Sequence, residues 1–243
     1  MPHPAMNREY EVRSDQTLTV IQQLINRGIT RISAIIRHSK RFYSTSARME
    51  PFMNLTPEGI AFAEKMGQNL PAGFRPRLYS SHIGRCIETA YLIDKGFSCR
   101  HGLKIPHNQV NEVLAPFYLN DIEQIIRLFK ERGTNHFLRD WFEHQIDESI
   151  MGNPVTTTTA LTGFMLDCID GLTDNEIAIC VSHDWNIYPL KEFALGLPHE
   201  DAGEVGYLDG VVFFQQDNQT YITSYQTGPI PVDAGLIPRQ GAG

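Results

Sequence analysis

Short apolar runs and amphipathic stripes alternate along this 243-residue chain. Residues 31–36 and 176–181 are almost continuously apolar, which is typical of strands covered on both faces of a parallel sheet. Residues 77–80 and 109–113 predict two further strands. Between these runs, apolar residues recur three and four positions apart, as on the buried face of a helix. Strands that alternate with helices predict a three-layer α/β/α fold with a mostly parallel central sheet.

Several predicted helices begin at a recognisable capping signal. Thr56-Pro57-Glu58 combines a hydroxyl cap, a proline in the first turn and an acidic residue, and it predicts a helix to about Asn69. Asp15 is expected to cap an earlier helix, which Gly28 would end. Another helix is expected to open at residues 80–81, with a core-facing stripe made of Ile83, Ile87, Ala90 and Tyr91.

The pattern changes between the third strand and residue 155. Asn120 is expected to cap a short amphipathic helix that Gly133 ends, and a second amphipathic piece follows. We therefore predict one domain over residues 1–243, with a helical cap insertion at about residues 115–155. Whether these helices form a lid or simply pack on the core stays open. Residues 211–215 and 220–225 flank Asp217-Asn218 and predict a hairpin at one antiparallel edge of the sheet.

Composition limits the classes of partner. The formal net charge is -7, which disfavours nucleic acid as a general partner but permits a small anion in a locally basic pocket. No apolar run approaches the ~20 residues of a membrane span, and the N-terminus lacks the apolar segment of a secretory signal. The four cysteines have no zinc-like spacing, so free thiols in a reducing compartment are expected. We therefore expect a cytoplasmic protein that binds neither nucleic acid nor membrane.

Cationic and imidazole side chains follow the predicted strands at their carboxyl ends. Arg37, His38 and Arg41 come after the first apolar run, and His183 comes after the last one. Arg85 lies at another junction between a strand and a helix. Because the carboxyl ends of parallel strands meet at one edge of a sheet, these groups should lie in one cleft. Arginines that neutralise a phosphate while an imidazole attacks it would suit phosphoryl transfer without a metal.

The order of these motifs resembles the histidine phosphatase superfamily, which includes phosphoglycerate mutases and acid phosphatases. That family begins with Arg-His-Gly after its first strand, and its second signature is Ser, three residues, Arg, three residues, Thr-Ala. The resemblance covers roughly residues 32–214. The matching stretches are Arg37-His38-Ser39, Leu55-Thr56-Pro57-Glu58-Gly59, Ser81 to Ala90 with Arg85 in its middle, and Ile177 to His183 followed by Asp184.

The resemblance implies a role for each matched residue. His38 would be the nucleophile that becomes phosphohistidine. The phosphate pocket would be formed by Arg37, Arg41, Arg85 and His183. A histidine followed by aspartate marks the acid-phosphatase branch, so Asp184 would be the proton donor. Glu112 resembles the position where the mutase-like branch keeps its acid, and the choice between these two carboxylates stays open although Asp184 is favoured.

One departure from the family pattern concerns Ser39, which stands where the family has glycine. Serine would be costly if that position needs a positive φ or a close backbone approach.

The expected function is a metal-independent and cofactor-independent phosphatase that acts on a small phosphorylated molecule or a phosphoprotein. A phosphomutase on the same site, or an inactive protein that binds phospho-ligands as a scaffold, remains an alternative. The sequence does not predict the oligomeric state.

Overall fold

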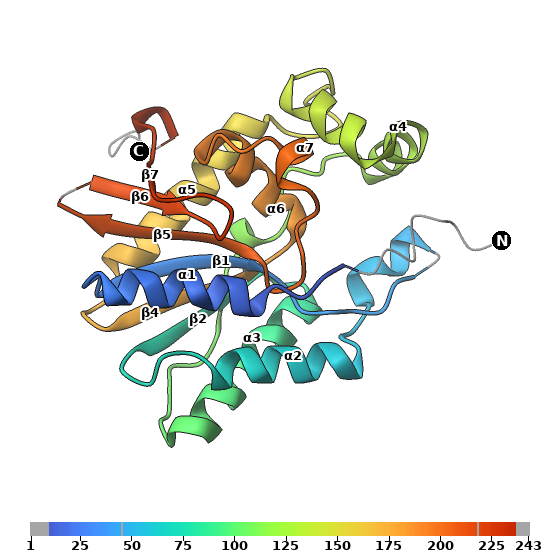
Figure 1. Cartoon of the computed structure of the whole chain (residues 1–243). Coiled ribbons are helices and arrows are strands. Elements are labelled where there is room, and N and C mark those ends of the chain that lie inside the picture. The colour runs from blue at the N-terminus through green and yellow to red at the C-terminus, as the bar shows by residue number, and fades with distance from the viewer. Residues whose placement is uncertain (1–9, 45, 218, 237–243) are drawn as a thin grey trace.

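One seven-stranded sheet runs through the computed structural model, which describes residues 10–44, 46–217 and 219–236 (Figure 1). Its strand order is β3-β2-β4-β1-β5-β6-β7. The strands are β1 (Arg31–Arg37), β2 (Arg75–Ser80), β3 (Gln109–Val110), β4 (Glu176–Ser182), β5 (Gly210–Gln216), β6 (Gln219–Thr223) and β7 (Ile230–Pro231).

The sheet is mixed, with a parallel part and an antiparallel edge. β1, β2, β3 and β4 pair in parallel, whereas β5, β6 and β7 pair in antiparallel fashion. β4 is buried throughout, and β1 is buried at every residue except Arg31. Such burial on both faces explains why these two strands are almost continuously apolar in the sequence. The mostly parallel α/β/α fold predicted from the sequence is therefore confirmed.

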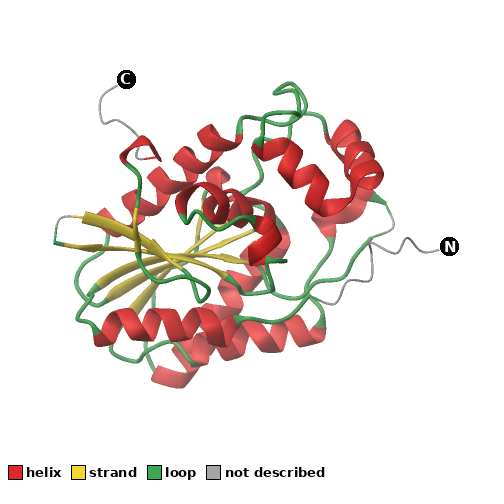
Figure 2. Cartoon of the chain, turned by 45° about the horizontal axis from the view of Figure 1, so that its top comes forward, coloured by secondary structure: helices red, strands yellow, loops and turns green. Residues whose placement is uncertain are grey.

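Helices cover both faces of this sheet (Figure 2). Within the described residues, no helix is long and apolar enough to cross a membrane. On one face lie α1 (Ser14–Asn26), α2 (Pro57–Gln68) and α3 (Gly84–His101), and on the other side lie α4 (Ile122–Phe142), α5 (Pro154–Asp170), α6 (Asp184–Pro189) and α7 (His199–Ala202). Shorter turns are η2 (Ala47–Phe52), η3 (Glu112–Leu114), the π-helical turn η4 (Leu190–Ala194) and η5 (Ala234–Leu236).

The two faces of the sheet form two separate apolar cores. In β1, Ile32, Ala34 and Ile36 pack against α1, α2 and α3, whereas Ile35 packs into the core on the α5 side. This division follows from the alternation of side chains along a strand. Because both cores hold β1 and β4 from opposite sides, the carboxyl ends of these strands are fixed in position.

The first turns of two helices differ from their prediction. Asp15 lies inside the first turn of α1, and Arg13 occupies the N-cap position. α3 begins at Gly84, a few residues later than expected.

Ile87 and Tyr91 of α3, predicted to face the core, are 38% and 63% exposed. Ala90 is buried as predicted, but the rest of the buried stripe lies one position away, because the face that carries Cys86, Ala90, Ile93 and Phe97 packs in one core with β2, β4 and α2.

The edges of the sheet also differ from the prediction. β3 ends at Val110 rather than at residue 113, because Asn111 accepts a hydrogen bond from the Val113 amide and starts the turn η3. β7 was not predicted, since proline disfavours a strand interior but is tolerated on an edge strand. The predicted hairpin is present as β5 and β6, and its residue Asn218 lies outside the described residues.

The segment between β3 and α5 carries α4, which is divided at Gly133. This glycine has φ +74° and ψ 167°, so the two amphipathic pieces predicted from the sequence meet there at a kink. Asp121 rather than Asn120 caps the helix, through the amide of Gln124. Trp141, buried in α4, donates its indole N–H to the Gly152 carbonyl at 2.7 Å. The second half of α4 is thereby held against the core on the α5 side.

Candidate active site

Two histidines meet where β1 and β4 end. Arg37 and Ser182 are partners in the parallel register, so the residues that follow them, His38 and His183, emerge side by side. The centres of their rings are 5.5 Å apart, and both residues are buried. Arg85, in the first turn of α3, reaches both rings. The predicted gathering of these groups at the carboxyl edge of the sheet is what the structure contains.

The orientation of His38 is set by its two ring nitrogens. Its Nδ1 lies 2.8 Å from the carbonyl oxygen of Ser39, which can only accept, so Nδ1 carries the proton. Nε2 therefore has the free lone pair, and it accepts a hydrogen bond from Nε of Arg85 at 3.0 Å. The nitrogen able to attack an electrophile is thus Nε2, and it faces the guanidinium group.

His183 is oriented by Arg85 and Ser81. Nη2 of Arg85 lies 3.3 Å from Nδ1 of His183, and a guanidinium can only donate, so Nδ1 accepts. The other nitrogen, Nε2, lies 3.0 Å from the Ser81 hydroxyl and donates to it. One guanidinium group therefore bridges the two imidazoles.

Both imidazoles are neutral near neutral pH. Burial lowers the pKa of His38 well below its ordinary value, and the nearby Arg85 and Arg37 lower it further. Burial followed by the charges of Arg85 and Arg41 does the same to the pKa of His183. The pKa of Arg85 is itself lowered, first by burial and then by Arg41. Burial is the largest cause of all three pKa shifts, and the neighbouring positive charges, which an anion would offset, add to it.

Arg37 is held in a fully buried position by aromatic and anionic neighbours. Its guanidinium carbon lies 4.0 Å from the centre of the Tyr10 ring and 4.5 Å from that of Tyr207. One terminal nitrogen donates to the Val205 carbonyl at 2.6 Å, and the other pairs with Asp184 at 3.1 Å. Its Nε is buried and has no hydrogen-bond partner among the described residues. An unpartnered cationic donor of this kind is suited to an arriving anion.

Arg41 has an environment similar to that of Arg37, with one aromatic ring and one carboxylate. Its guanidinium carbon lies 4.1 Å from the ring centre of Tyr43, whose hydroxyl is 2.7 Å from that of Tyr207. It pairs with the carboxylate of Glu50 in η2, and its Nε too is buried without a partner in the described part of the chain. Sequence reasoning missed Tyr10, Tyr207 and Glu50, because each comes from a segment outside the matched motifs.

Ser39 fits its position without strain. It is not among the residues with a positive φ, so glycine is not needed there for backbone conformation. Its amide donates to the Thr89 hydroxyl at 3.1 Å, and its own hydroxyl donates to the Gly59 carbonyl at 2.7 Å. The cost anticipated for serine at this position is therefore absent, and the hydroxyl instead links the turn that carries His38 to α2.

A comparison with family models matches residues 34–207 to the histidine phosphatase superfamily (branch 1). The match spans most of the chain and includes both histidines and all three arginines of the site. The chain belongs to the histidine phosphatase superfamily. The resemblance noted in the sequence is thereby confirmed.

Solved structures with the same fold include phosphatases and a mutase. The phosphoglycerate mutase from Bacillus anthracis str. Sterne has 18% identity and a TM-score of 0.54, over 82% of this chain and 94% of that one. A mycobacterial glucosyl-3-phosphoglycerate phosphatase in complex with VO3 has the same identity and TM-score, over 82% and 100%. A phosphoserine phosphatase mutant from Entamoeba histolytica, in complex with phosphoserine, has 16% identity and a TM-score of 0.51, over 79% and 95%. No curated protein sequence matched.

The two candidate acids of this superfamily member lie in different surroundings. Asp184 is largely buried, pairs with Arg37 and accepts a hydrogen bond from the Trp185 amide. Glu112 is exposed at the start of η3, and its carboxylate makes no hydrogen bond or ion pair with the residues that the structure describes. Asn186 holds η3 beside the His183 turn by donating to the carbonyls of Val113 and Ala115. The structure therefore brings Asp184 into the site and leaves Glu112 beside it.

One cluster of potential metal ligands lies away from the histidine pair. Glu192, His199 and Glu200 place their ligand atoms within 4.8 Å of one another. Arg139 already pairs with both carboxylates, at 2.8 Å for Glu192 and 2.6 Å for Glu200. These contacts account for the cluster as an ion-pair network that joins α4 to α7 and η4, and we call it the Arg139 clasp.

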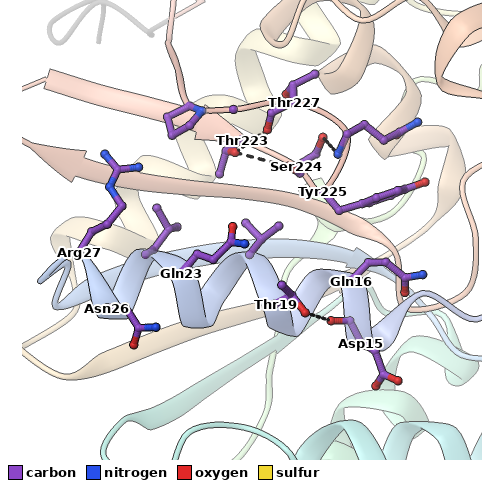
Figure 3. Close-up of a pocket in the computed structure, with 15 residues that line it drawn as sticks. Asp15, Gln16, Thr19, Gln23, Asn26, Arg27, Thr223, Ser224, Tyr225 and Thr227 are labelled. Carbon is purple, nitrogen blue, oxygen red and sulfur yellow. Dashed lines mark hydrogen bonds between the residues drawn. The ribbon is translucent and has the colours of Figure 1, made fainter.

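A large groove lies on the α1 side of the sheet, as Figure 3 shows. It has a volume of about 820 Å³ and runs between α1 and residues 223–229. Its lining includes Gln16, Gln23, Arg27 and Tyr225 but no member of the histidine and arginine cluster. The lining holds one carboxylate, one arginine and several hydroxyl and amide groups but no histidine or cysteine. Without an array of cations or a paired nucleophile and base, a volume of this size does not define a catalytic site.

Proposed function

We propose that this chain hydrolyses phosphate monoesters through a covalent phosphohistidine on His38. The observation that carries the proposal is the state of His38: a buried, neutral imidazole whose Nε2 lone pair faces Arg85. A neutral imidazole is a nucleophile, and an imidazolium is not. The unpartnered Nε atoms of Arg37 and Arg41 support a phosphate group as the electrophile.

The proposed reaction has two displacements at phosphorus. Arg37, Arg41, Arg85 and His183 bind the phosphate oxygens, which requires Arg85 to give up its bond to Nε2 of His38. Nε2 then forms a bond to phosphorus while the ester P–O bond breaks and the leaving oxygen takes up a proton from a carboxylic acid. Water next attacks phosphorus, the N–P bond breaks, and the proton from the water returns to the carboxylate. Arginines and an imidazole stabilise the equatorial charge in both steps, so no metal or other cofactor is needed.

The experiment that tests the proposal is single-turnover labelling with a phosphate ester carrying labelled phosphorus. We expect the label to remain on the wild-type protein after rapid quenching in base and to be lost in acid, since phosphohistidine is acid-labile. The His38→Ala protein should carry no label and show no turnover. Acid-stable label on a hydroxyl side chain, or turnover by the His38→Ala protein, would exclude this mechanism.

Asp184 is the proposed proton donor, supported by its position directly after His183 at the carboxyl end of β4. An alkyl leaving group needs a proton as the bond breaks, whereas a nitrophenyl leaving group largely does not. We expect Asp184→Asn to slow hydrolysis of an alkyl phosphate far more than that of nitrophenyl phosphate. Glu112→Gln should affect the two substrates equally. The reverse pattern, measured as kcat on both substrates, would assign the acid to Glu112.

A phosphomutase activity on the same site is the second candidate function. The likeness to the phosphoglycerate mutase from Bacillus anthracis favours it, as does the exposed Glu112 at the mutase-like position. Phosphate returned to an added acceptor alcohol, rather than released to water, would identify a mutase.

We propose a small phosphorylated molecule or a phosphoprotein as the substrate. A cytoplasmic location is likewise proposed, supported by four free cysteines of which three are buried.

A further inference from the structure

Glu50 places an oxygen acceptor on each of two arginines in the proposed phosphate pocket. Its Oε2 pairs with Nη1 of Arg41, and its Oε1 accepts a hydrogen bond from the Ser44 amide at 2.7 Å. Its backbone carbonyl accepts from Nη1 of Arg85 at 3.0 Å. A single residue of η2 therefore meets both cations with oxygen acceptors, as two oxygens of a phosphate group would.

The charge balance of the site makes this contact significant. Arg37 is paired with Asp184, and Arg41 is paired with Glu50, so two of the three guanidinium charges are already neutralised inside the protein. The side chains of Arg41 and Glu50 are 12% and 26% exposed, so water screens the pair only partly. A phosphate dianion that uses Arg41 must displace this carboxylate or share the cation with it.

We propose that Glu50 competes with the substrate phosphate for Arg41 and thereby sets the affinity of this site for phosphate esters. The inference rests on the function proposed above, because it concerns the same phosphate pocket. Before substrate binds, Glu50 keeps Arg41 stacked on Tyr43 and neutralised. When phosphate binds, the carboxylate of Glu50 leaves Arg41, and the segment around η2 loses this contact. The phosphate ester then binds a guanidinium group that was already held in position for it.

Competition by a carboxylate has a measurable consequence that a purely structural ion pair does not have. Glu50→Gln keeps the shape and the backbone contacts but removes the negative charge. We expect inorganic phosphate to bind the Glu50→Gln protein about ten-fold more tightly than the wild type, the effect of removing one partly exposed competing charge. Titration calorimetry with inorganic phosphate measures this without requiring turnover. Glu58→Gln is the matched control, since Glu58 pairs with Lys40 next to the same turn and should leave phosphate affinity unchanged.

The possible outcomes separate this inference from the proposed function. Weaker or unchanged phosphate binding by the Glu50→Gln protein would overturn competition and make Glu50 a support for Arg41. A kcat that collapses for an alkyl phosphate but not for nitrophenyl phosphate would instead make Glu50 the proton donor and also overturn it. If Arg85→Ala binds phosphate as well as the wild type, the phosphate pocket itself is misplaced and the proposed function fails with it.

Cleavage after Arg48 gives an independent readout. Arg48 is exposed in η2, two residues before Glu50. Trypsin should cut there several-fold faster in wild-type protein saturated with inorganic phosphate, because the contacts of Glu50 that hold this segment have been replaced. In the Glu50→Gln protein, cleavage should already be fast without phosphate. Slower cleavage on adding phosphate would mean that the segment closes over the anion, which contradicts competition.

Discussion

Arg85 reaches both imidazoles of the site, His38 and His183, and it also donates to the Glu50 carbonyl. Its Nε and Nη atoms act as a fork, which a lysine cannot reproduce. We expect Arg85→Ala to lower kcat by about 10²- to 10³-fold, the scale of losing one donor to the transition state. Arg85→Lys should also show a low kcat, close to that of Arg85→Ala. Arg100→Ala, at the other end of α3, is the control in steady-state assays with nitrophenyl phosphate. A comparable loss of kcat in the Arg100→Ala protein would show a general effect on the helix.

The lowered pKa values of His38 and His183 also affect stability. Above the usual histidine pKa of about 6.5, neither the folded nor the unfolded form binds these protons. Below this pKa, the histidines bind protons in the unfolded chain but stay unprotonated in the folded protein. The free energy of unfolding therefore falls as pH falls. The slope contributed by each histidine rises from near zero above its usual pKa toward a limit of about 1.4 kcal/mol per pH unit below it. Urea denaturation between pH 8 and pH 5.5 should show a shallower decline for His183→Asn, and equal slopes would contradict this cause.

At the scale of elements, α2 and α3 approach each other closely enough that glycine is required on both helices. A Cβ added at Gly67 would lie 2.1 Å from the Ile93 carbonyl oxygen, and one added at Gly96 would lie 2.0 Å from that of Glu64. Backbone must move to admit a methyl group, so Gly96→Ala should lower the free energy of unfolding by about 1–3 kcal/mol. Gly84→Ala on the same helix meets nothing within 4 Å and is the control in thermal denaturation. Equal effects of the two substitutions would argue against this close crossing.

At the scale of the whole molecule, the Arg139 clasp connects α4 to η4 and α7, which follow His183 in the chain. The hydrogen bond from Arg139 lowers the pKa of Glu200 to about 2. The clasp is therefore complete above the usual glutamate range and is lost as pH falls toward 2. Arg139→Ala should remove the clasp at any pH and leave the sheet intact.

Hydrogen exchange tests this whole-molecule prediction. Amides of α4 should exchange about five-fold faster in the Arg139→Ala protein, a loss on the order of 1 kcal/mol for a partly exposed network. Amides of β1 and β4 should be unaffected, because both strands are buried between the two cores. Arg132→Ala, which removes a different ion pair of α4, provides a comparison. Uniformly faster exchange across the sheet would show that the clasp stabilises the entire fold instead.

Local sequence patterns predicted those features of the fold that depend only on residues close together in the chain. The burial of β1 and β4, the cap at Thr56 and the break at Gly133 all follow from residue type and period. The positions of Tyr207 and Glu50 depend on where distant segments cross the site, and no local period encodes that. The buried face of α3 was predicted one position away for the same reason, since its position depends on how the helix lies against β2, β4 and α2.

The hydrogen bond from Ser39 to the Gly59 carbonyl has a consequence for recognising related chains. A Cβ on Gly59 would lie 1.9 Å from the Lys40 carbonyl oxygen, so the strict demand for glycine falls on this residue of the Leu-Thr-Pro-x-Gly stretch. The residue after the histidine needs only to be small. A search pattern that insists on Arg-His-Gly would pass over this chain, whereas one that links a small residue there to the later glycine would retrieve it and others built in the same way.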